Sequence, residues 1–246
     1  LRAAFDICND NFTELYDGSG GLLHKIEGTN FTGSLLVGHS TTGTLSSAEH
    51  NVGIGFQTLD SLTSGQKNVA LGAQAASSIT SGVRNIAIGY RALYQQTDIN
   101  DNIGIGQETL RYDNGGRNIA IGYQALRALE RTSAGNNLAI GYRAGAESTT
   151  GRQNVFLGDS AGRETTTGSY NIAIGYAALL TEDDAGRNVA IGYEALRDQN
   201  ASVASTNTAV GYHAGTNVTT GINNTIIGGL AGDALTTGSN NIIIGK

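Results

Sequence analysis

The chain has 246 residues, including 36 Gly but no Pro, Met or Trp, and only 15% of its residues are charged. Disordered Gly-rich chains usually contain Pro and lack β-branched residues, whereas this chain is rich in Ile and Val in short regular runs, which argues for an ordered fold. The net charge of −6 argues against nucleic acid or an anionic membrane as the main partner, and no run of about 18 apolar residues is present that could insert into a bilayer.

The N-terminal segment "LRAAFDICNDNFTELYD" places apolar side chains at spacings of 4, 3, 4 and 3, namely at Leu1, Phe5, Cys8, Phe12 and Leu15. Two heptads of core positions predict a short helical coiled-coil stem, residues 1–17, although an amphipathic helix packed on its own chain would have the same pattern. The following residues, 18–33, begin with "GSGG" and are expected to form a Gly-rich hinge and lead-in. Cys8 is the only Cys, so no intrachain disulfide can form.

Residues 34–246 repeat one phrase, exemplified by "NIAIGYRAL" from Asn85. Successive starts differ by 17 in residue number, except for one interval of 16 and two of 19. The starts are Ser34, Asn51, Asn68, Asn85, Asn102, Asn118, Asn137, Asn154, Asn171, Asn188, Asn207, Asn224 and Asn241. A phrase repeated this often indicates an architectural unit rather than a catalytic site.

We number each repeat from this start as position 1. Positions 2 and 4 are almost always Ile, Val or Leu, position 3 is usually Ala or Gly, and position 5 is always Gly. This alternation predicts a short strand, followed by a corner that a Cβ would strain. We expect the Asn amides to hydrogen-bond between repeats and the Gly residues to stack. The predicted structural ladder comprises Asn51, Asn68, Asn85, Asn118, Asn137, Asn171 and Asn188, with Gly55, Gly72, Gly89, Gly122, Gly141, Gly175 and Gly192.

A second short strand is expected after the corner, as at Tyr90–Leu93, and then a polar loop. Two strands in one repeat without helical periodicity predict an all-β protein, a parallel β-solenoid of about 12 coils. The expected core of a coil holds the bulky residues of positions 2 and 4 with an Ala and a Leu from the second strand. Because this core is thin compared with the entropy of ordering a whole repeat, we expect one apolar face to be poorly covered and the chain to be an obligate oligomer.

No enzyme is predicted, and no catalytic residue, metal ligand or cofactor site is assigned. "GIGFQ" at Gly53 lacks the third Gly and the helix of a dinucleotide fingerprint, and its Gly residues belong to the repeat. The four His residues show no ligand spacing. "TEDD" at Thr181–Asp184 lacks the Gly-rich nonapeptide of calcium-binding rolls, and we expect a solvated loop.

Two recurrent surface positions remain. Position 6 is often Tyr, which predicts an aromatic ladder or, as the alternative, a stripe for surface contact with carbohydrate or protein: Tyr90, Tyr123, Tyr142, Tyr176, Tyr193 and Tyr212. Position 13 is often Thr, as at Thr63 and Thr80, and a flat Thr array could bind ice. The long intervals predict that Arg127–Asn136 and Arg197–Asn207 bulge from the surface.

The phrase "NIAIGYxAL…TTGxxN", which covers residues 34–246, resembles repeats of phage tail-fibre proteins and is more distantly similar to the "SVAIG" repeats of YadA-like heads in trimeric autotransporter adhesins. The segment "LRAAFDICNDNFTELYD" also looks like a segment near the start of phage virion structural proteins. The resemblance implies a homotrimer of left-handed parallel β-rolls around a three-fold axis. The adhesin repeat is shorter, so the loop at positions 10–17 is an addition.

We therefore expect a structural, non-enzymatic trimeric fibre segment of a phage tail, extracellular on the virion, that contributes to host-surface attachment. Its expected partners are further copies of itself, other tail or baseplate proteins, and a host-surface glycan or protein, without nucleic acid or membrane insertion. The alternatives are the head of a bacterial trimeric surface adhesin, which needs a signal peptide and an anchor that are not found in this sequence, and an ice-binding β-solenoid.

Overall fold

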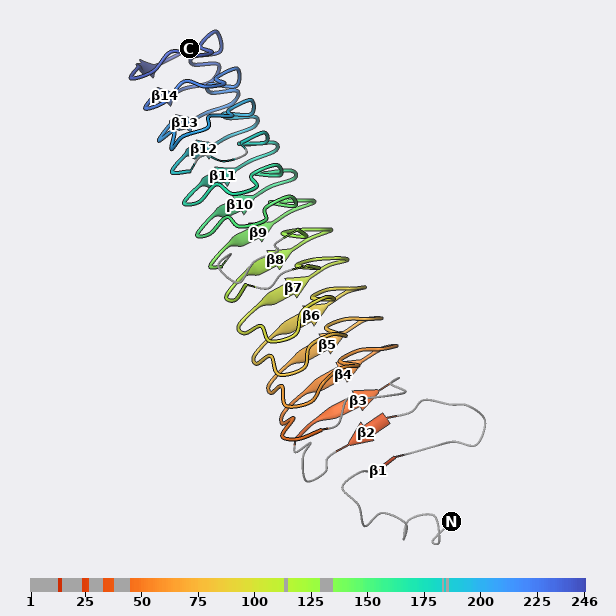
Figure 1. Cartoon of the computed structure of the whole chain (residues 1–246). Coiled ribbons are helices and arrows are strands. Elements are labelled where there is room, and N and C mark those ends of the chain that lie inside the picture. The colour runs from red at the N-terminus through yellow and green to blue at the C-terminus, as the bar shows by residue number, and fades with distance from the viewer. Residues whose placement is uncertain are drawn as a thin grey trace, which may run out of the picture. The chain divides into compact units, whose positions relative to one another are not determined.

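The computed structural model describes residues 33–37, 45–112, 115–128, 135–182, 184 and 186–246, together with the backbone of two short strands nearer the N-terminus. These residues form an all-β parallel β-solenoid of about 11 turns of about 17 residues, as the sequence predicts, and contain no helix. The chain divides into two units, Leu1–Glu108 and Thr109–Lys246. Figure 1 shows the flat coils of each unit, each contributing one short strand.

Every strand from β3 onward is three residues long and occupies positions 2–4 of its repeat. The first unit contains β1 (Thr13–Glu14), β2 (His24–Ile26), β3 (Leu35–Val37), β4 (Val52–Ile54), β5 (Val69–Leu71), β6 (Ile86–Ile88) and β7 (Ile103–Ile105). The second contains β8 (Ile119–Ile121), β9 (Leu138–Ile140), β10 (Val155–Leu157), β11 (Ile172–Ile174), β12 (Val189–Ile191), β13 (Thr208–Val210), β14 (Thr225–Ile227) and β15 (Ile242–Ile244).

Strand pairing is parallel and in register from coil to coil. In the first unit β3 to β7 pair in sequence order, and β1, β2 and β3 pair antiparallel before them. In the second unit β8 to β15 pair in the same way as β3 to β7. Equivalent repeat positions are therefore neighbours, as with Ile172 and Val189. Each repeat position consequently forms a column along its unit.

The predicted stem, residues 1–17, lies outside the described residues except for Thr13–Glu14, which form β1. Its expected core residues, Leu1, Phe5, Cys8, Phe12 and Leu15, are all among the residues that are not described. Within the predicted hinge and lead-in, residues 18–33, the chain forms β2 at His24–Ile26.

The second strand predicted at Tyr90–Leu93 is wrong, because this segment forms turns. Arg91 and Leu93 both have a φ of 54°, in the left-handed region, and the equivalent residues of other coils do the same. A strand needs negative φ at every residue, so alternating left-handed residues curl the chain instead. Non-Gly residues adopt this conformation at a cost of roughly 1–2 kcal/mol each, and bonds between coils, such as Arg91 N–H to Ala73 O at 3.1 Å, offset it.

The expectation that the bulky residues of positions 2 and 4 fill the core is also wrong. Position 3 points inward and is fully buried, as at Ala87 and Ala120, whereas Ile54 and Leu71 are 41% and 45% exposed. The buried Leu residues of position 9, such as Leu59, form the opposite wall: a Cβ added to Gly53 at position 3 would lie 3.3 Å from Leu59 Cδ1. The coil is so narrow that a small residue faces a large one across it.

A large residue stands at position 3 in four coils, and two of these coils show how its volume is compensated. Position 3 holds Phe156 in one coil, and there position 9 is Gly in that coil and in the preceding one, at Gly162 and Gly145. A Cβ on Gly145 would meet the Phe156 ring at 2.6 Å, so the ring occupies the space that Leu fills elsewhere. Ile226 at position 3 is likewise accompanied by Gly215 and Gly232 at position 9. Total volume across the coil is thus maintained.

The Asn column is buried and bonds successive coils, as expected from the sequence. Asn137 Nδ2 donates to Asn118 Oδ1 at 3.2 Å and to Gly151 O at 3.0 Å, while Asn137 Oδ1 accepts the backbone N–H of Asn154 at 2.9 Å. The left-handed backbone lies one residue earlier than expected, at the residue that precedes each Asn, where φ is 46–68°. We call this preceding residue the edge residue of its coil.

The corner Gly residues have no room for a side chain. Gly122 has a φ of 128°, and a Cβ built on it would lie 2.3 Å from the carbonyl oxygen of Gly141 in the next coil. Gly175 and Gly192 are arranged in the same way. The Gly column is therefore required both by φ and by the close stacking of backbones.

We predict that Gly122→Ala lowers the free energy of unfolding by roughly 3 kcal/mol or more, because it adds a backbone clash to a strained φ. Gly229→Ala is the matched control, since its Cβ would meet only Tyr212 O at 4.0 Å, and it should change stability by about 0.5 kcal/mol or less. Urea midpoints at equal chain concentration measure both. Equal losses in the two variants would contradict the assigned corner.

Replacing one amide of the Asn column should also be costly. Asn137→Leu leaves the buried Asn154 N–H and Gly151 C=O without their partner, which costs about 1–3 kcal/mol for each group. The neighbouring variant Asn136→Ala, at an exposed edge residue, should cost about 1 kcal/mol or less. A similar shift of the urea midpoint in both variants would show that the column does not hold the coils together.

Candidate interaction face

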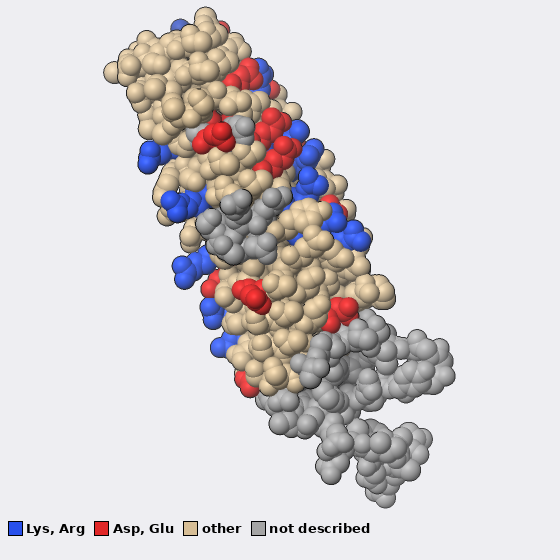
Figure 2. All heavy atoms as spheres, viewed as in Figure 1, with Lys and Arg blue, Asp and Glu red and all other residues tan. Residues whose placement is uncertain are grey.

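The outward side chains of positions 2 and 4 form a nearly continuous apolar surface in each unit, which we call the apolar face. They are half-buried or exposed in every strand from β3 to β15. Ile, Val or Leu occupies both positions in all of these strands except β13 and β14, where Thr208 and Thr225 stand at position 2. On the side of the molecule that Figure 2 shows, most charged side chains lie along the edges, and a few acidic side chains stand within the broad surface between them.

The apolar face is large for a surface left to solvent. Neighbouring strands lie about 4.8 Å apart and three strand residues span about 10 Å, so β8 to β15 present a patch of roughly 300 Å². This is the size of the largest apolar patches on ordinary monomers, which mark interaction sites when they are contiguous. The feature is therefore the strongest candidate for a binding surface.

The Tyr column borders one edge of the apolar face. Its six residues are exposed by 38–57%, and several rings stack on the ring of the next coil: Tyr123 on Tyr142 at 5.2 Å, Tyr176 on Tyr193 at 5.0 Å and Tyr193 on Tyr212 at 5.4 Å. Ring faces that stack on one another are covered, so hydroxyls and ring edges are left for solvent. This geometry fits an aromatic ladder better than a platform for sugar stacking.

The edge residues border the other side of the face. They are His50, Lys67, Arg84 and Asp101 in the first unit, and Arg117, Asn136, Gln153, Tyr170, Arg187, Thr206, Asn223 and Asn240 in the second. Arg84 donates to both carboxylate oxygens of Asp101, at 2.5 and 3.0 Å, and this contact raises the pKa of Arg84. Arg152 and Arg187 each lie 5.9 Å from the ring centre of Tyr170.

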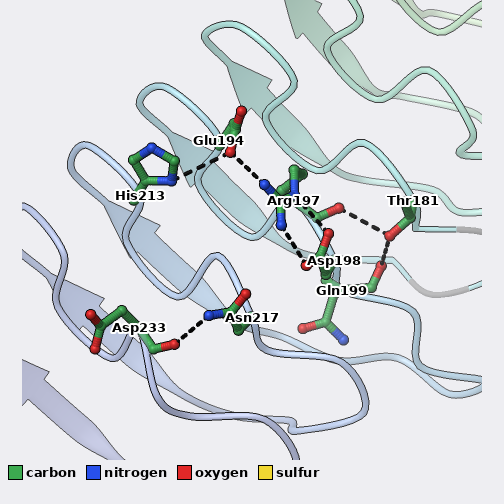
Figure 3. A network of polar contacts seen from close by, with 8 residues as sticks. All are labelled: Thr181, Glu194, Arg197, Asp198, Gln199, His213, Asn217 and Asp233. Carbon is green, nitrogen blue, oxygen red and sulfur yellow. Dashed lines mark hydrogen bonds and ion pairs between the residues drawn. The ribbon is translucent and has the colours of Figure 1, made fainter.

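A polar network lies beyond the Tyr column in the second unit (Figure 3). Arg197 donates to both oxygens of Asp198 at 2.7 Å and to Glu194 Oε2 at 2.6 Å, so the pKa of Arg197 is raised. His213 Nδ1 lies 3.4 Å from Glu194 Oε2, and its ring packs edge-on against Tyr212. The network connects coils on a partly exposed surface, where such ion pairs contribute little stability.

The described residues contain no cluster of His, Cys, Asp or Glu that could hold a metal ion, and no helix that could cross a membrane. Gly53 and Gly55 of the "GIGFQ" segment are positions 3 and 5 of a coil. The solvated loop expected at Thr181–Asp184 is wrong for Glu182, which is fully buried and accepts from Asn188 Nδ2 at 3.4 Å. Glu182 stands at position 12, where the side chains of other coils are also buried, as at Leu62 and Ile79.

The Thr residues of position 13 already use their hydroxyls. Thr63 Oγ1 donates to Thr80 O at 3.1 Å, Thr149 to Thr166 O at 3.2 Å, and Thr219 to Thr236 O at 3.2 Å. Each bond joins one coil to the next, so the column serves the solenoid itself.

The long coil that starts at Asn188 keeps its register by bulging, as expected. Val189 pairs with Thr208 although the coil between them is longer than most others, and Ser202, Val203 and Ala204 are exposed while Ala201 and Ser205 remain buried. Ile119 pairs with Leu138 across the other long coil, in which residues 129–134 are not described.

No protein family, no curated protein and no solved structure matches the chain. The sequence predicted the Asn, Gly and Tyr columns. It did not predict that the side chains of positions 2 and 4 point outward, and it did not identify the edge residues. The pairing of Phe156 with Gly145 and Gly162 is the sequence feature that could have identified position 3 as internal.

The pKa of Tyr193 is raised by partial burial, by the charge of Glu194 and by its Tyr neighbours. A raised folded-state pKa means that the folded state holds its proton more tightly, so stability should fall as the pH rises above the unfolded value of about 10. We predict that Tyr193→Phe loses less melting temperature than the wild type between pH 9 and about pH 11. A titration of absorbance at 295 nm, with Tyr193→Phe as the reference, measures the group directly. A midpoint for Tyr193 at or below about 10 would contradict the assignment.

Proposed function

We propose that the chain is a structural segment of a homotrimeric phage tail fibre, and that the apolar face lies at the interface between protomers. The observation that carries the proposal is the continuity of this face from coil to coil. A solenoid with a small-residue core buries little apolar area by itself, and packing positions 2 and 4 of several chains together would supply the missing burial.

A parallel arrangement around one axis suits this face. All strands in a unit are in register, so related copies can match the side chains of positions 2 and 4 at every coil without any change in period. The number three comes from the sequence resemblance to tail-fibre repeats and to trimeric adhesin heads. The same resemblance supports a location on a virion.

The remaining surfaces would then face outward. The bulge at Ser202–Ala204 is exposed and includes the apolar side chain of Val203, which makes it the first candidate for a host-surface glycan or protein or for another tail or baseplate component. The proposed role is non-enzymatic and needs no cofactor.

Sedimentation equilibrium of the purified chain at low micromolar concentration tests the assembly, and we predict a trimer without a folded monomer. Ile121→Glu places a charge in the apolar face and should abolish or strongly weaken the trimer, by about 3 kcal/mol or more per interface. Ser202→Glu, on the exposed bulge, is the control and should leave the trimer intact. A monomer that is folded by circular dichroism in the wild type would overturn the proposal.

The location on a virion has its own test. Antibodies against the chain should label the tail region of particles in immunogold microscopy. Labelling of bacterial cell surfaces instead would favour the adhesin head, and thermal hysteresis of the purified chain would favour the ice-binding solenoid.

A further inference from the structure

Resting on the proposed trimer, we propose that the two edges of the apolar face recognise each other between protomers. The edge residues of one chain would lie against the side chains at position 6 of the next chain, coil by coil. Arg84, Arg117 and Arg187 would then contact Tyr90, Tyr123 and Tyr193 of the adjacent protomer.

In a closed ring of identical chains, one edge of each apolar face must contact the opposite edge of the neighbouring chain. The edge residue precedes the strand and position 6 follows it, so the two columns border opposite sides of the same three-residue strand. In a parallel assembly with cyclic symmetry the interface is heterologous, so one side of each face meets the other side of its neighbour. The columns that flank the apolar face are therefore the first side chains outside the buried centre of each interface.

In the coils with Arg at the edge, the two edges carry residues that can bond to each other. Each Arg among the edge residues has Tyr at position 6 of the coil that it opens: Arg84 with Tyr90, Arg117 with Tyr123, and Arg187 with Tyr193. The one acidic edge residue, Asp101, goes with Gln107, and the one acidic side chain at position 6, Asp159, goes with Gln153. Two charges of like sign never face each other at these two columns.

Contact within one chain does not account for this match. The strand and its two corners separate the members of each pair by roughly 15 Å, at about 3.3 Å for each extended residue. Their neighbours within the chain are in adjacent coils instead, as shown by Arg84 with Asp101 and by Tyr123 with Tyr142. A contact with another copy would bring the matched residues together.

The chemistry favours a hydrogen bond to the phenol oxygen. Tyr193 stacks on a Tyr ring on each side and Tyr123 on one side, so these contacts leave a cation less access to the π-surface. Each phenol oxygen can accept a hydrogen bond even where the hydroxyl has a partner, as Tyr193 has in Glu194, so a guanidinium N–H can donate to it. Arg117, Tyr123 and their equivalents are exposed in the single chain, as partners in such a contact must be.

Cross-linking between Cys residues tests the proposal with the full chain. In a Cys8→Ser background, the double variant Arg117→Cys and Tyr123→Cys is treated with a bismaleimide about as long as an Arg and a Tyr side chain together, and is run on a denaturing gel. An Arg side chain that donates to a Tyr hydroxyl holds the two Cα atoms beyond the roughly 7 Å that a direct disulfide needs, so the linker replaces the reach of the two side chains. We expect covalent trimers, because each chain would be linked to both of its neighbours, and we expect only monomers from either single-Cys variant.

The outcomes separate this inference from the proposed trimer. Sedimentation of the untreated double variant shows whether it is trimeric before cross-linking. A trimer that yields no covalent trimer overturns the edge contact and leaves the proposed function standing, whereas a wild-type chain that is not trimeric overturns both. Covalent dimers from Arg117→Cys alone would show that like edges meet, which also contradicts the inference. Arg84→Cys with Tyr90→Cys repeats the test in the first unit if the first pair does not fold.

Discussion

The buried amide at the start of each coil is the interaction on which the solenoid depends. In the coil of Asn137 it closes its own turn through Gly151 O, accepts the backbone N–H of Asn154 and donates to the amide of Asn118. A polar group with these partners is stable only at a fixed distance between coils, so the column sets the register. Variation in coil length is consequently confined to residues after the turn. The chain that leads from Asn188 to Asn207 bulges there, while the backbone N–H of Asn207 still donates to Asn188 Oδ1 and Asn207 Nδ2 to Gly221 O.

The close stacking that these amides impose decides which side chains can be internal. Corner Gly backbones approach so closely that no Cβ fits between Gly122 and Gly141, and a flat coil leaves room for only one large residue across its width. Leu takes that space at position 9, Ala faces it at position 3, and the Ile and Val residues of positions 2 and 4 must point outward. A surface that is apolar at nearly every coil is thus a consequence of the narrow interior, and surfaces of this kind often mark interaction sites.

The sequence was sufficient to predict the period, the all-β solenoid and the Asn and Gly columns, because each depends on a residue type with one dominant physical property. The sequence was insufficient wherever the same pattern of residues is compatible with two different structures. Alternation of Ile, Ala and Ile defines two faces of a strand but not which face is internal, and nothing in the residue types of Arg91 and Leu93 specifies a positive φ. Those φ values arise from bonds between coils, which belong to the stacked structure and not to any single repeat.

Positions within the repeat therefore differ in how strongly the stacked coils restrict their side chains. Buried positions are nearly uniform because stacked coils impose the same space and the same hydrogen bonds on each of them. Edge residues have the same backbone conformation in every coil yet include Lys, Arg, Asp, Tyr and Thr, so the backbone does not select their side chains. Contacts between adjacent coils, such as Arg84 with Asp101, account for part of this variation. Each of the three Arg residues at the edge shares its coil with a Tyr at position 6, as Arg117 does with Tyr123, and a repeated interface between identical chains would favour such a combination.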